Sequence, residues 1–390
     1  MSGLLVFFLL YFSIYGTVHL YLLIKWRRAF YLQGVQYVLL FAILTFLMLA
    51  PINAHLLETQ GYWLPALVLT WAGYLWMGFV FIYLCLALPL DLYHLLLSLG
   101  QRLSGGDWTV LMLSRRQSAV LATVLAVVLM AYGVVEARRI SVETVTLRSP
   151  KIPGNTAPIR IVQISDLHLG PMLYPGRLTP IIEAVTQAHP DILVCTGDLV
   201  DGRMVNPASV MAALRNLAAP MGKFAVTGNH EYYFGLEKAV DFIRDSGFVL
   251  LRNQHVSAGP HVAIIGLDDP AGGKVQQGSS EMQLLAAVPD DKFKLLLKHR
   301  PLLDANSKNR FDLQLSGHTH QGQIFPFGLL VQLFFPVGQG LRQVAPHSYI
   351  YTSRGTGTWG PPIRLLAPPE ITVFDILPGH IQSAAAPSQP

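Results

Sequence analysis

Four long apolar runs occupy the first third of the chain. They cover residues 3–24, 35–52, 64–90 and 118–136, and shorter polar stretches separate them. A helix needs about 20 mostly apolar residues to cross the hydrocarbon core of a bilayer. We therefore predict an N-terminal α-helical membrane region, residues 1–139, with about four transmembrane helices.

The pattern changes after residue 139. Short β-branched or aliphatic runs recur, and segments with helical periodicity lie between several of them, for example at 178–188 and 207–217. This alternation predicts an α/β domain over residues 159–377. Residues 140–158, with prolines towards their end, are interpreted as a linker, and residues 378–390 as a disordered tail. The predicted strands are 159–164, 192–196, 224–227, 261–266, 295–298, 313–316 and 349–352.

Composition and charge support this division. Hydrophobic residues make up 52% of the chain and charged residues 13%, against roughly 25% charged in an average soluble domain, which excludes a single soluble domain. Residues 1–139 hold 8 of the 28 basic and 4 of the 23 acidic residues, so most of the net charge of +5 arises there. Nucleic-acid binding is therefore not predicted. The two cysteines, Cys85 and Cys195, exclude a disulfide framework.

Basic residues predict the orientation in the membrane. Lys25, Arg27 and Arg28 follow the first apolar run, Arg102, Arg115 and Arg116 lie between the third and fourth, and residues 53–63 contain no Lys or Arg. Positively charged loops stay on the cytoplasmic side, so we expect a multi-pass integral membrane protein with its large domain on the non-cytoplasmic side. If residues 64–99 instead cross twice, as a hairpin broken near Pro89, the domain becomes cytoplasmic.

Polar residues follow five of the predicted strands, at the point where each strand ends. In open α/β sheets, ligand sites lie outside the carboxyl ends of the strands. Buried polar groups without partners are costly, so their recurrence at this one place in the unit predicts a common site. The five blocks are Ser165-Asp166-Leu167-His168, Gly197-Asp198-Leu199-Val200-Asp201, Gly228-Asn229-His230-Glu231, His299-Arg300-Pro301 and Gly317-His318-Thr319-His320.

These blocks resemble those of the calcineurin-like metallophosphoesterases, which run Asp-x-His, Gly-Asp-x-x-Asp, Gly-Asn-His-Glu/Asp, His and Gly-His-x-His. The resemblance covers residues 158–377. It implies an α/β fold in which two mixed β-sheets form a sandwich flanked by helices, and it implies metal-dependent hydrolysis of phosphoric esters, phosphodiesters among them. Four further segments resemble the membrane-associated branch of this family. They are Gly322-Gln323, Ser353-Arg354-Gly355-Thr356-Gly357, Pro361-Pro362-Ile363-Arg364 and Ala367-Pro368-Pro369-Glu370-Ile371.

The resemblance also implies a binuclear metal centre. Imidazole and carboxylate ligands together suit Mn, Fe or Zn, whereas Mg and Ca prefer mostly oxygen. Two such divalent ions acidify a bridging water, so that a hydroxide attacks phosphorus in line with the leaving oxygen. In the family's pattern the first metal is held by Asp166, His168 and His320, the second by Asn229, His299 and His318, and Asp198 bridges both.

Four more residues receive roles from the same pattern. His230 corresponds to a catalytic imidazole that protonates the leaving alkoxide. Asp201 and Glu231 are interpreted as groups that orient the ligands. Arg300, next to His299, is either a phosphate contact or a structural arginine.

Two functions remain open at this point. The first is a membrane-anchored di-metal phosphoesterase acting on a phosphomonoester, phosphodiester or pyrophosphate. The second is a non-catalytic membrane sensor or scaffold that binds metal or a phosphorylated lipid, and the complete set of site residues argues against it. Residues 324–337 are unusually apolar for a loop at a metal site. They either pack in the core or form a lipid-contacting surface, which would suit a lipid-linked substrate.

Overall fold

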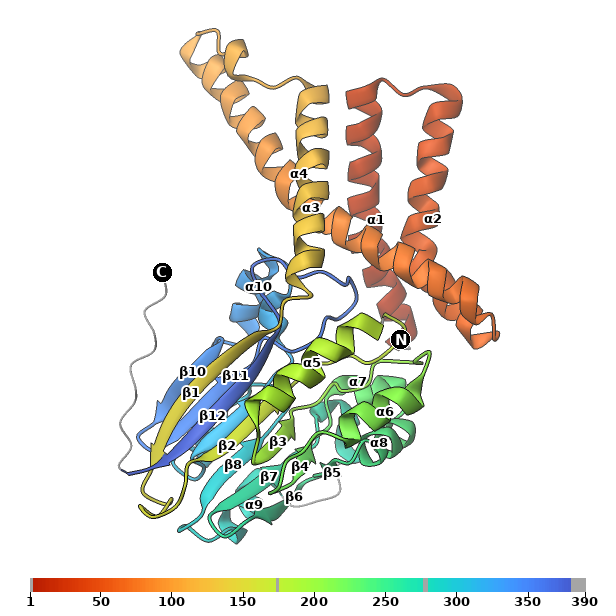
Figure 1. The fold of residues 1–390 in the computed structure, drawn as a ribbon. Coiled ribbons are helices and arrows are strands. Elements are labelled where there is room, and N and C mark those ends of the chain that lie inside the picture. Colours follow the sequence, from red (N-terminus) through yellow and green to blue (C-terminus); the bar gives the residue numbers. More distant parts are fainter. Residues whose placement is uncertain (1–2, 173–174, 276–279, 380–390) are drawn as a thin grey trace. The chain divides into compact units, whose positions relative to one another are not determined.

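The computed structural model of the chain describes residues 3–172, 175–275 and 280–379. Its contacts divide the chain into a helical unit, Met1–Val135 with Gly360–Ile363, and an α/β unit, Glu136–Trp359 with Arg364–Pro390. The helical unit contains α1 (Gly3–Phe30), α2 (Gly34–Thr59), α3 (Trp63–Ser104), the 3₁₀ helix η1 (Thr109–Leu111) and α4 (Arg115–Glu136) (Figure 1). All four α-helices are long and apolar enough to cross a membrane.

The third helix excludes one of the predicted topologies. Residues Trp63–Ser104 form a single helix of 42 residues with Pro89 inside it, so the alternative of a hairpin broken near Pro89 is wrong. Proline removes one helical hydrogen bond and kinks a helix, but the apolar turns on both sides continue through it. At a rise of about 1.5 Å per residue, α3 is about 63 Å long, roughly twice the thickness of the hydrocarbon core.

The α/β unit is built on two six-stranded mixed sheets, which confirms the predicted fold class (Figure 1). In spatial order, the first sheet contains β1 (Ser141–Ser149), β12 (Glu370–Pro378), β2 (Ile159–Ile164), β3 (Ile192–Cys195), β4 (Lys223–Ala225) and β5 (Val249–Leu250). The second contains β10 (Gly340–Ala345), β11 (Ser348–Thr352), β9 (Leu313–Ser316), β8 (Phe293–Leu297), β7 (Val262–Gly266) and β6 (Gln254–Ala258). The strands β2, β3 and β4 run parallel to one another, as do β7, β8 and β9.

Side chains from both sheets form the central core. Ile161 and Ile192 of the first sheet cluster with Leu295 and Leu313 of the second, and all four are fully buried. Burying such a side chain contributes about 1.5–3 kcal/mol relative to leaving it exposed. The outer face of the first sheet packs on α5 (Pro175–Ala188), α6 (Pro207–Arg215) and α8 (Leu236–Asp245), and that of the second on α9 (Glu281–Ala287). Short helices complete the unit: α7 (Asn229–Phe234), α10 (Phe327–Phe334), η2 (Pro270–Val275), η3 (Ala305–Ser307) and η4 (His320–Gly322).

The interpretation of residues 140–158 as a linker is wrong in its first half. Ser141–Ser149 form β1, which pairs in parallel with β12 over its whole length. Val142, Thr144 and Val145 are β-branched and favour a strand, whereas the prolines and glycine that suggested a linker come only from residue 150 onwards. At the other end, β12 reaches Pro378, and residues 380–390 of the predicted disordered tail lie outside the described residues.

Candidate metal centre

Strand ends from both sheets bring the predicted site residues together. Asp166 and His168 follow β2, Asp198 follows β3, and His299 follows β8. The block after β4 opens α7 with Asn229 and His230, and the block after β9 leads into η4 with His318 and His320. Parallel strands end at the same edge of a sheet. Ligands as far apart in the chain as Asp166 and His320, which are 154 positions apart, therefore form one site.

The backbone at this site has an unusual conformation. Asp166, His168, Asp198, His318 and His320 all have positive φ angles, between 49° and 69°. Residues with a Cβ rarely adopt the left-handed region, and such residues cluster at functional sites where the surrounding structure holds them in place. The strain therefore coincides with five of the seven predicted metal ligands.

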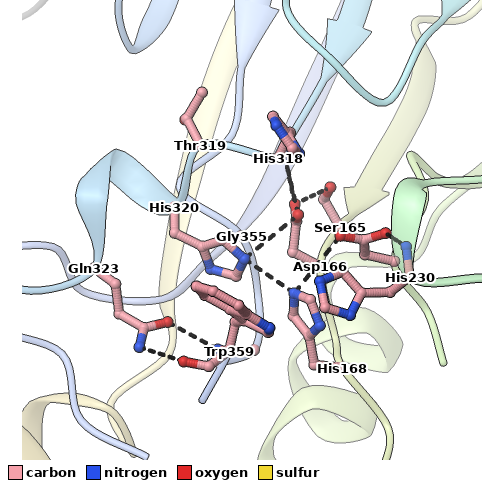
Figure 2. Close-up of polar contacts among 12 residues, drawn as sticks. Ser165, Asp166, His168, His230, His318, Thr319, His320, Gln323, Gly355 and Trp359 are labelled. Atoms are coloured by element: carbon pink, nitrogen blue, oxygen red, sulfur yellow. Dashed lines mark hydrogen bonds and ion pairs between the residues drawn. The ribbon is translucent and has the colours of Figure 1, made fainter. Parts of the chain in front are cut away.

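One group of potential ligand atoms is formed by Asp166, His168 and His320, whose atoms lie within 4.8 Å of one another. The Nε2 atoms of His168 and His320 face each other at 3.0 Å, and Nε2 of His320 lies 3.5 Å from Oδ1 of Asp166 (Figure 2). The Asp166 carboxylate also accepts hydrogen bonds from the hydroxyl of Ser165 and the backbone N–H of His318. Two buried imidazole nitrogens and a carboxylate thus converge on one point.

A second group consists of Asp198, His299 and His318. Nε2 of His299 lies 3.1 Å from Oδ2 of Asp198, 3.1 Å from Nδ1 of His318 and 3.2 Å from Oδ1 of Asn229. Asp198 also belongs to a third group with His168 and His230. It therefore lies between the two sets of ligands that the family's pattern assigns to separate metals.

The electrostatics of these residues fit a divalent cation. Burial, with the charges of His299 and Arg300, lowers the pKa of His318 to about 3, and burial lowers the pKa of His320 well below its usual range. Both imidazoles are thus neutral, and each ring has one nitrogen with a lone pair. Burial alone would lower the pKa of His299, but the charge of Asp198 raises it to about 10, which reflects a strongly negative local field. Imidazole nitrogens beside carboxylate oxygens form the mixed ligand set that Mn, Fe and Zn accept.

Glu231 and Asp201 hold parts of the site in position. The buried Glu231 carboxylate accepts hydrogen bonds from the backbone N–H groups of Asp198, Val200 and Gly228. Asp201 pairs with Nδ1 of His230 and lies 3.5 Å from Nδ1 of His168. Burial alone would raise the pKa of Asp201, but the hydrogen bonds from these two histidines outweigh it and lower the pKa to about 2.

Gly228 illustrates how closely the blocks approach one another. A Cβ atom at this position would lie 2.1 Å from Oδ1 of Asp198 and 2.6 Å from its backbone nitrogen. Any side chain would therefore displace the carboxylate that lies between the two ligand groups. The glycine at the start of the block is required because the backbone must pass directly against Asp198.

The side chain of Arg300 pairs with an acidic residue of the chain. Its Nε and Nη2 donate to the two carboxylate oxygens of Asp269, at 2.8 and 3.0 Å. This bidentate ion pair favours the structural alternative, although the residue directly follows His299 in the chain. Sequence reasoning did not anticipate Asp269, because no motif connects the two.

Arg364 is a component of the site that sequence reasoning missed. Its side chain is fully buried, and Nη2 lies 3.0 Å from Nδ1 of His320. Burial, followed by the nearby charge of Arg177, lowers the pKa of Arg364 to about 9, which leaves the guanidinium protonated at neutral pH. An arginine inside the run Pro361-Pro362-Ile363-Arg364-Leu365-Leu366 was the available signal, because a lone charge among apolar residues needs buried partners.

Aromatic rings surround the histidines of the site. The ring centroid of His230 lies 5.3 Å from that of Tyr233 and 5.9 Å from that of Trp359, and these two residues are largely exposed. The Gln323 amide accepts from the Trp359 N–H and donates to its carbonyl oxygen (Figure 2). The ring of Phe335, directly after α10, lies 5.3 Å from that of His318.

The helix α10 carries most of the apolar segment that follows Gly-His-Thr-His. None of its residues is buried, so the core-packing alternative is wrong for this helix. Leu329, Leu330, Leu333 and Phe334 are between 52% and 76% exposed. A contiguous exposed apolar surface of this kind marks an interaction site.

Comparisons with known proteins agree with this geometry. The family model for calcineurin-like phosphoesterases matches residues 159–322. An uncharacterized metallophosphoesterase of Aquifex aeolicus is 40% identical over 255 residues, which cover 65% of this chain and 97% of the relative. A transmembrane protein with metallophosphoesterase domain from Danio rerio is 30% identical over 334 residues, which cover 81% of this chain and 74% of the relative. An uncharacterized metallophosphoesterase of Helicobacter pylori is 37% identical over 223 residues, covering 56% of this chain and only 60% of the relative.

The matched region begins at β2 and ends directly after the Gly-His-Thr-His block, so it contains all five blocks of the candidate centre. The Aquifex aeolicus relative is aligned over almost its whole length. The chain therefore belongs to the calcineurin-like phosphoesterase family and is a metal-dependent phosphoric ester hydrolase.

Proposed function

We propose that this chain is a membrane-anchored phosphoesterase with two metals, which hydrolyses a phosphomonoester, a phosphodiester or a pyrophosphate. The observation that carries the proposal is the position of Asp198. Its carboxylate belongs to ligand groups on both sides, with His168 and with His299 and His318. A single carboxylate shared by two groups of imidazoles suits two metals close together, and Mn, Fe and Zn all accept these ligands.

The residues of the chain would act around the bound phosphate as follows. Two divalent metals held by these ligands would supply Lewis acidity towards the phosphoryl oxygens. Asp201 pairs with Nδ1 of His230, which fixes the ring and leaves Nε2 to donate a proton to the leaving alkoxide. Glu231 accepts the backbone N–H groups of Asp198 and Val200 and so keeps the Asp198 carboxylate in place.

Removing and restoring the metal tests this proposal. We expect the full chain in detergent to lose hydrolysis of a generic aryl phosphodiester after treatment with a chelator. One of Mn²⁺, Fe²⁺ or Zn²⁺, added singly, should restore the rate better than Mg²⁺, because imidazole ligands favour transition metals. The absence of turnover with every one of these metals, in protein shown to be folded and metal-loaded, would favour the non-catalytic sensor or scaffold function.

We further propose that the substrate is linked to a lipid. This proposal is supported by the exposed apolar side chains of α10, which begins a few residues after His320, and by the exposed rings of Tyr233 and Trp359 beside His230. Exposed leucine, phenylalanine and tryptophan side chains favour the boundary between headgroups and acyl chains. Only residues 137–140 separate α4 from β1, and four residues reach at most about 14 Å, so a membrane-spanning α4 would keep the α/β unit close to the bilayer.

Substrate preference tests the lipid linkage. We expect a lipid phosphodiester in mixed micelles to be hydrolysed at least about tenfold faster than its water-soluble headgroup analogue, a difference of about 1.4 kcal/mol. The double change Leu333→Gln and Phe334→Gln should reduce the rate on the lipid and leave the rate on the soluble analogue unchanged. Equal rates on both substrates in the unchanged protein would remove the support for a lipid-linked substrate.

We further propose that the α/β unit lies on the non-cytoplasmic side. With four membrane-spanning helices, both ends of the helical region lie on the same side of the bilayer. The basic residues Arg102, Arg115 and Arg116 flank the connection between α3 and α4, which supports a cytoplasmic position for this connection. A phosphatase reporter fused after Gln389 should be active in intact cells, and an inactive phosphatase fusion with an active cytoplasmic reporter at the same position would reverse the orientation.

A further inference from the structure

We propose that Arg364 is a positioning residue for the metal centre: its buried guanidinium orients the imidazole of His320 and thereby sets metal affinity at the group formed by Asp166, His168 and His320. The inference rests on the proposed function, because it assigns His320 to a metal. Arg364 itself lies behind the ligands and is not a catalytic residue.

The first observation is the set of partners that the guanidinium has. Arg364 is completely buried, and its nitrogens donate to backbone carbonyl oxygens from three segments of the chain. The acceptors are Gly357 (3.1 Å from Nε and 2.5 Å from Nη2), Arg354 (2.8 Å from Nη1), His320 (3.0 Å from Nη1), Ala367 (3.2 Å from Nη1) and Gly355 (3.3 Å from Nη2). A planar group with five N–H donors in fixed directions fits such a cage, whereas an ammonium does not.

The second observation concerns the two nitrogens of His320. A guanidinium only donates hydrogen bonds, so Nδ1 of His320 must be the acceptor of the 3.0 Å contact with Nη2 of Arg364. On the opposite side of the ring, Nε2 faces His168 and Asp166. A neutral ring that accepts at Nδ1 carries its proton on Nε2, so a metal ion bound at Nε2 would displace that proton, and the guanidinium charge at Nδ1 would offset the negative charge that the ring then carries. Metal-ligating histidines usually donate from their second nitrogen to an acceptor, whereas the second nitrogen of His320 accepts from a buried cation.

The third observation is that the same guanidinium holds the segment behind Asp166. Gly355 has a φ angle of +81°, and a Cβ there would lie 3.0 Å from Cβ of Asp166 and 3.2 Å from Nδ1 of His320. The N–H of Gly357 donates to the carbonyl oxygen of Asp166. Arg364 therefore supports two of the three members of one ligand group. Within the part of the chain that the structure describes, Arg364 forms no hydrogen bond with Asp198, His299 or His318, so the effect should be confined to one of the two metals.

The variant Arg364→Lys tests this selectivity in the full-length protein in detergent. We expect Mn²⁺ titration to show one site weakened by about 10–100-fold, as for other residues that orient metal ligands, and a second site unchanged. After dialysis against low Mn²⁺, elemental analysis should find close to one ion per chain, where the unchanged protein holds two. The rate on an aryl phosphodiester should recover at saturating Mn²⁺, with KM for the substrate unaltered.

Two further variants test whether the effect on the metal is specific to the Arg364 guanidinium. Arg160→Lys is the matched control, because Arg160 forms a bidentate ion pair with Asp375 between β2 and β12 and touches no predicted ligand. Arg364→Ala should regain its weakened Mn²⁺ site when guanidinium ions are added at millimolar concentration, since they can occupy the vacated cage. Should Arg364→Lys bind both ions as tightly as the unchanged protein, or lose both equally without guanidinium rescue of Arg364→Ala, the positioning role is wrong.

Failure of the proposed function would look different. In that case the unchanged protein itself would bind fewer than two Mn²⁺ ions or would hydrolyse no phosphoester, before any variant is compared with it.

Discussion

Replacing Asp198 by asparagine should lower phosphoester hydrolysis by a factor on the order of 10³ or more, the largest effect expected for any single change in this chain. Asp198 is the carboxylate shared by the ligand groups around His168 and around His299 and His318. Asparagine keeps the shape of the side chain but removes the negative charge that would balance two divalent cations. The loss should appear in kcat at saturating substrate and should persist at high metal concentration.

Several features of the fold make this variant interpretable. Glu231 accepts a hydrogen bond from the backbone N–H of Asp198, which the substitution leaves in place. The Asp198 carboxylate accepts the backbone N–H of His230, and the amide oxygen of asparagine can accept the same bond. The protein should therefore fold. Asp375→Asn, which removes the ion pair with Arg160 on the first sheet, is the matched control and should retain its activity. A folded Asp198→Asn protein with an unchanged rate would contradict the whole assignment of the metal centre.

Replacing His230 by asparagine should produce the second largest effect, and the size should depend on the leaving group. A general acid typically contributes about 10²–10⁴-fold. That contribution matters most when the leaving group is an alkoxide, which needs a proton, and least when it is a nitrophenolate, which leaves as a stable anion. We therefore expect a loss of about 10²–10⁴-fold on an alkyl phosphodiester and a much smaller loss on a nitrophenyl ester.

Metal content separates this role from direct ligation. A ligand atom of His230 lies within 4.8 Å of those of His168 and Asp198, so a metal-binding role is the real alternative. If His230 is the proton donor, the asparagine variant should keep both metal ions. His255→Asn, at an exposed position in β6, serves as the control. Loss of one ion together with equal rate losses for both leaving groups would make His230 a ligand and not a general acid.

The positions of the strands could be predicted well from local patterns. All seven predicted strands occur, with ends shifted by at most two residues, because fully buried strands read as continuous apolar runs. Five strands were not predicted, namely β1, β5, β6, β10 and β12. Strand β5 contains two residues, too few for a period, and β1 places the exposed Val142, Thr144 and Arg148 between partly or fully buried side chains, so it resembled a linker.

The site residues were predictable for the same reason. Blocks such as Gly317-His318-Thr319-His320 follow their strands directly, and parallel strands carry such blocks to a common edge. Arg300 shows the limit of this reasoning. Its neighbour in sequence is His299, but its partner is Asp269, which reaches it only because β7 and β8 lie side by side.

By itself, the sequence determined that the chain has four apolar helices, an α/β domain, and five polar blocks at the ends of strands, because each of these is a local pattern with a fixed period or position. The grouping of the ligands, with Asp198 between two groups, was implied by the family resemblance and by no local pattern, and it is the tertiary structure that brings these residues together. Only the tertiary structure decided that Arg300 pairs with Asp269 and that Arg364 supports His320. Those relations join residues as far as 154 positions apart (Asp166 and His320). They depend on the register and packing of two sheets, and a backbone held at positive φ at five ligand positions is stable only when that packing is complete.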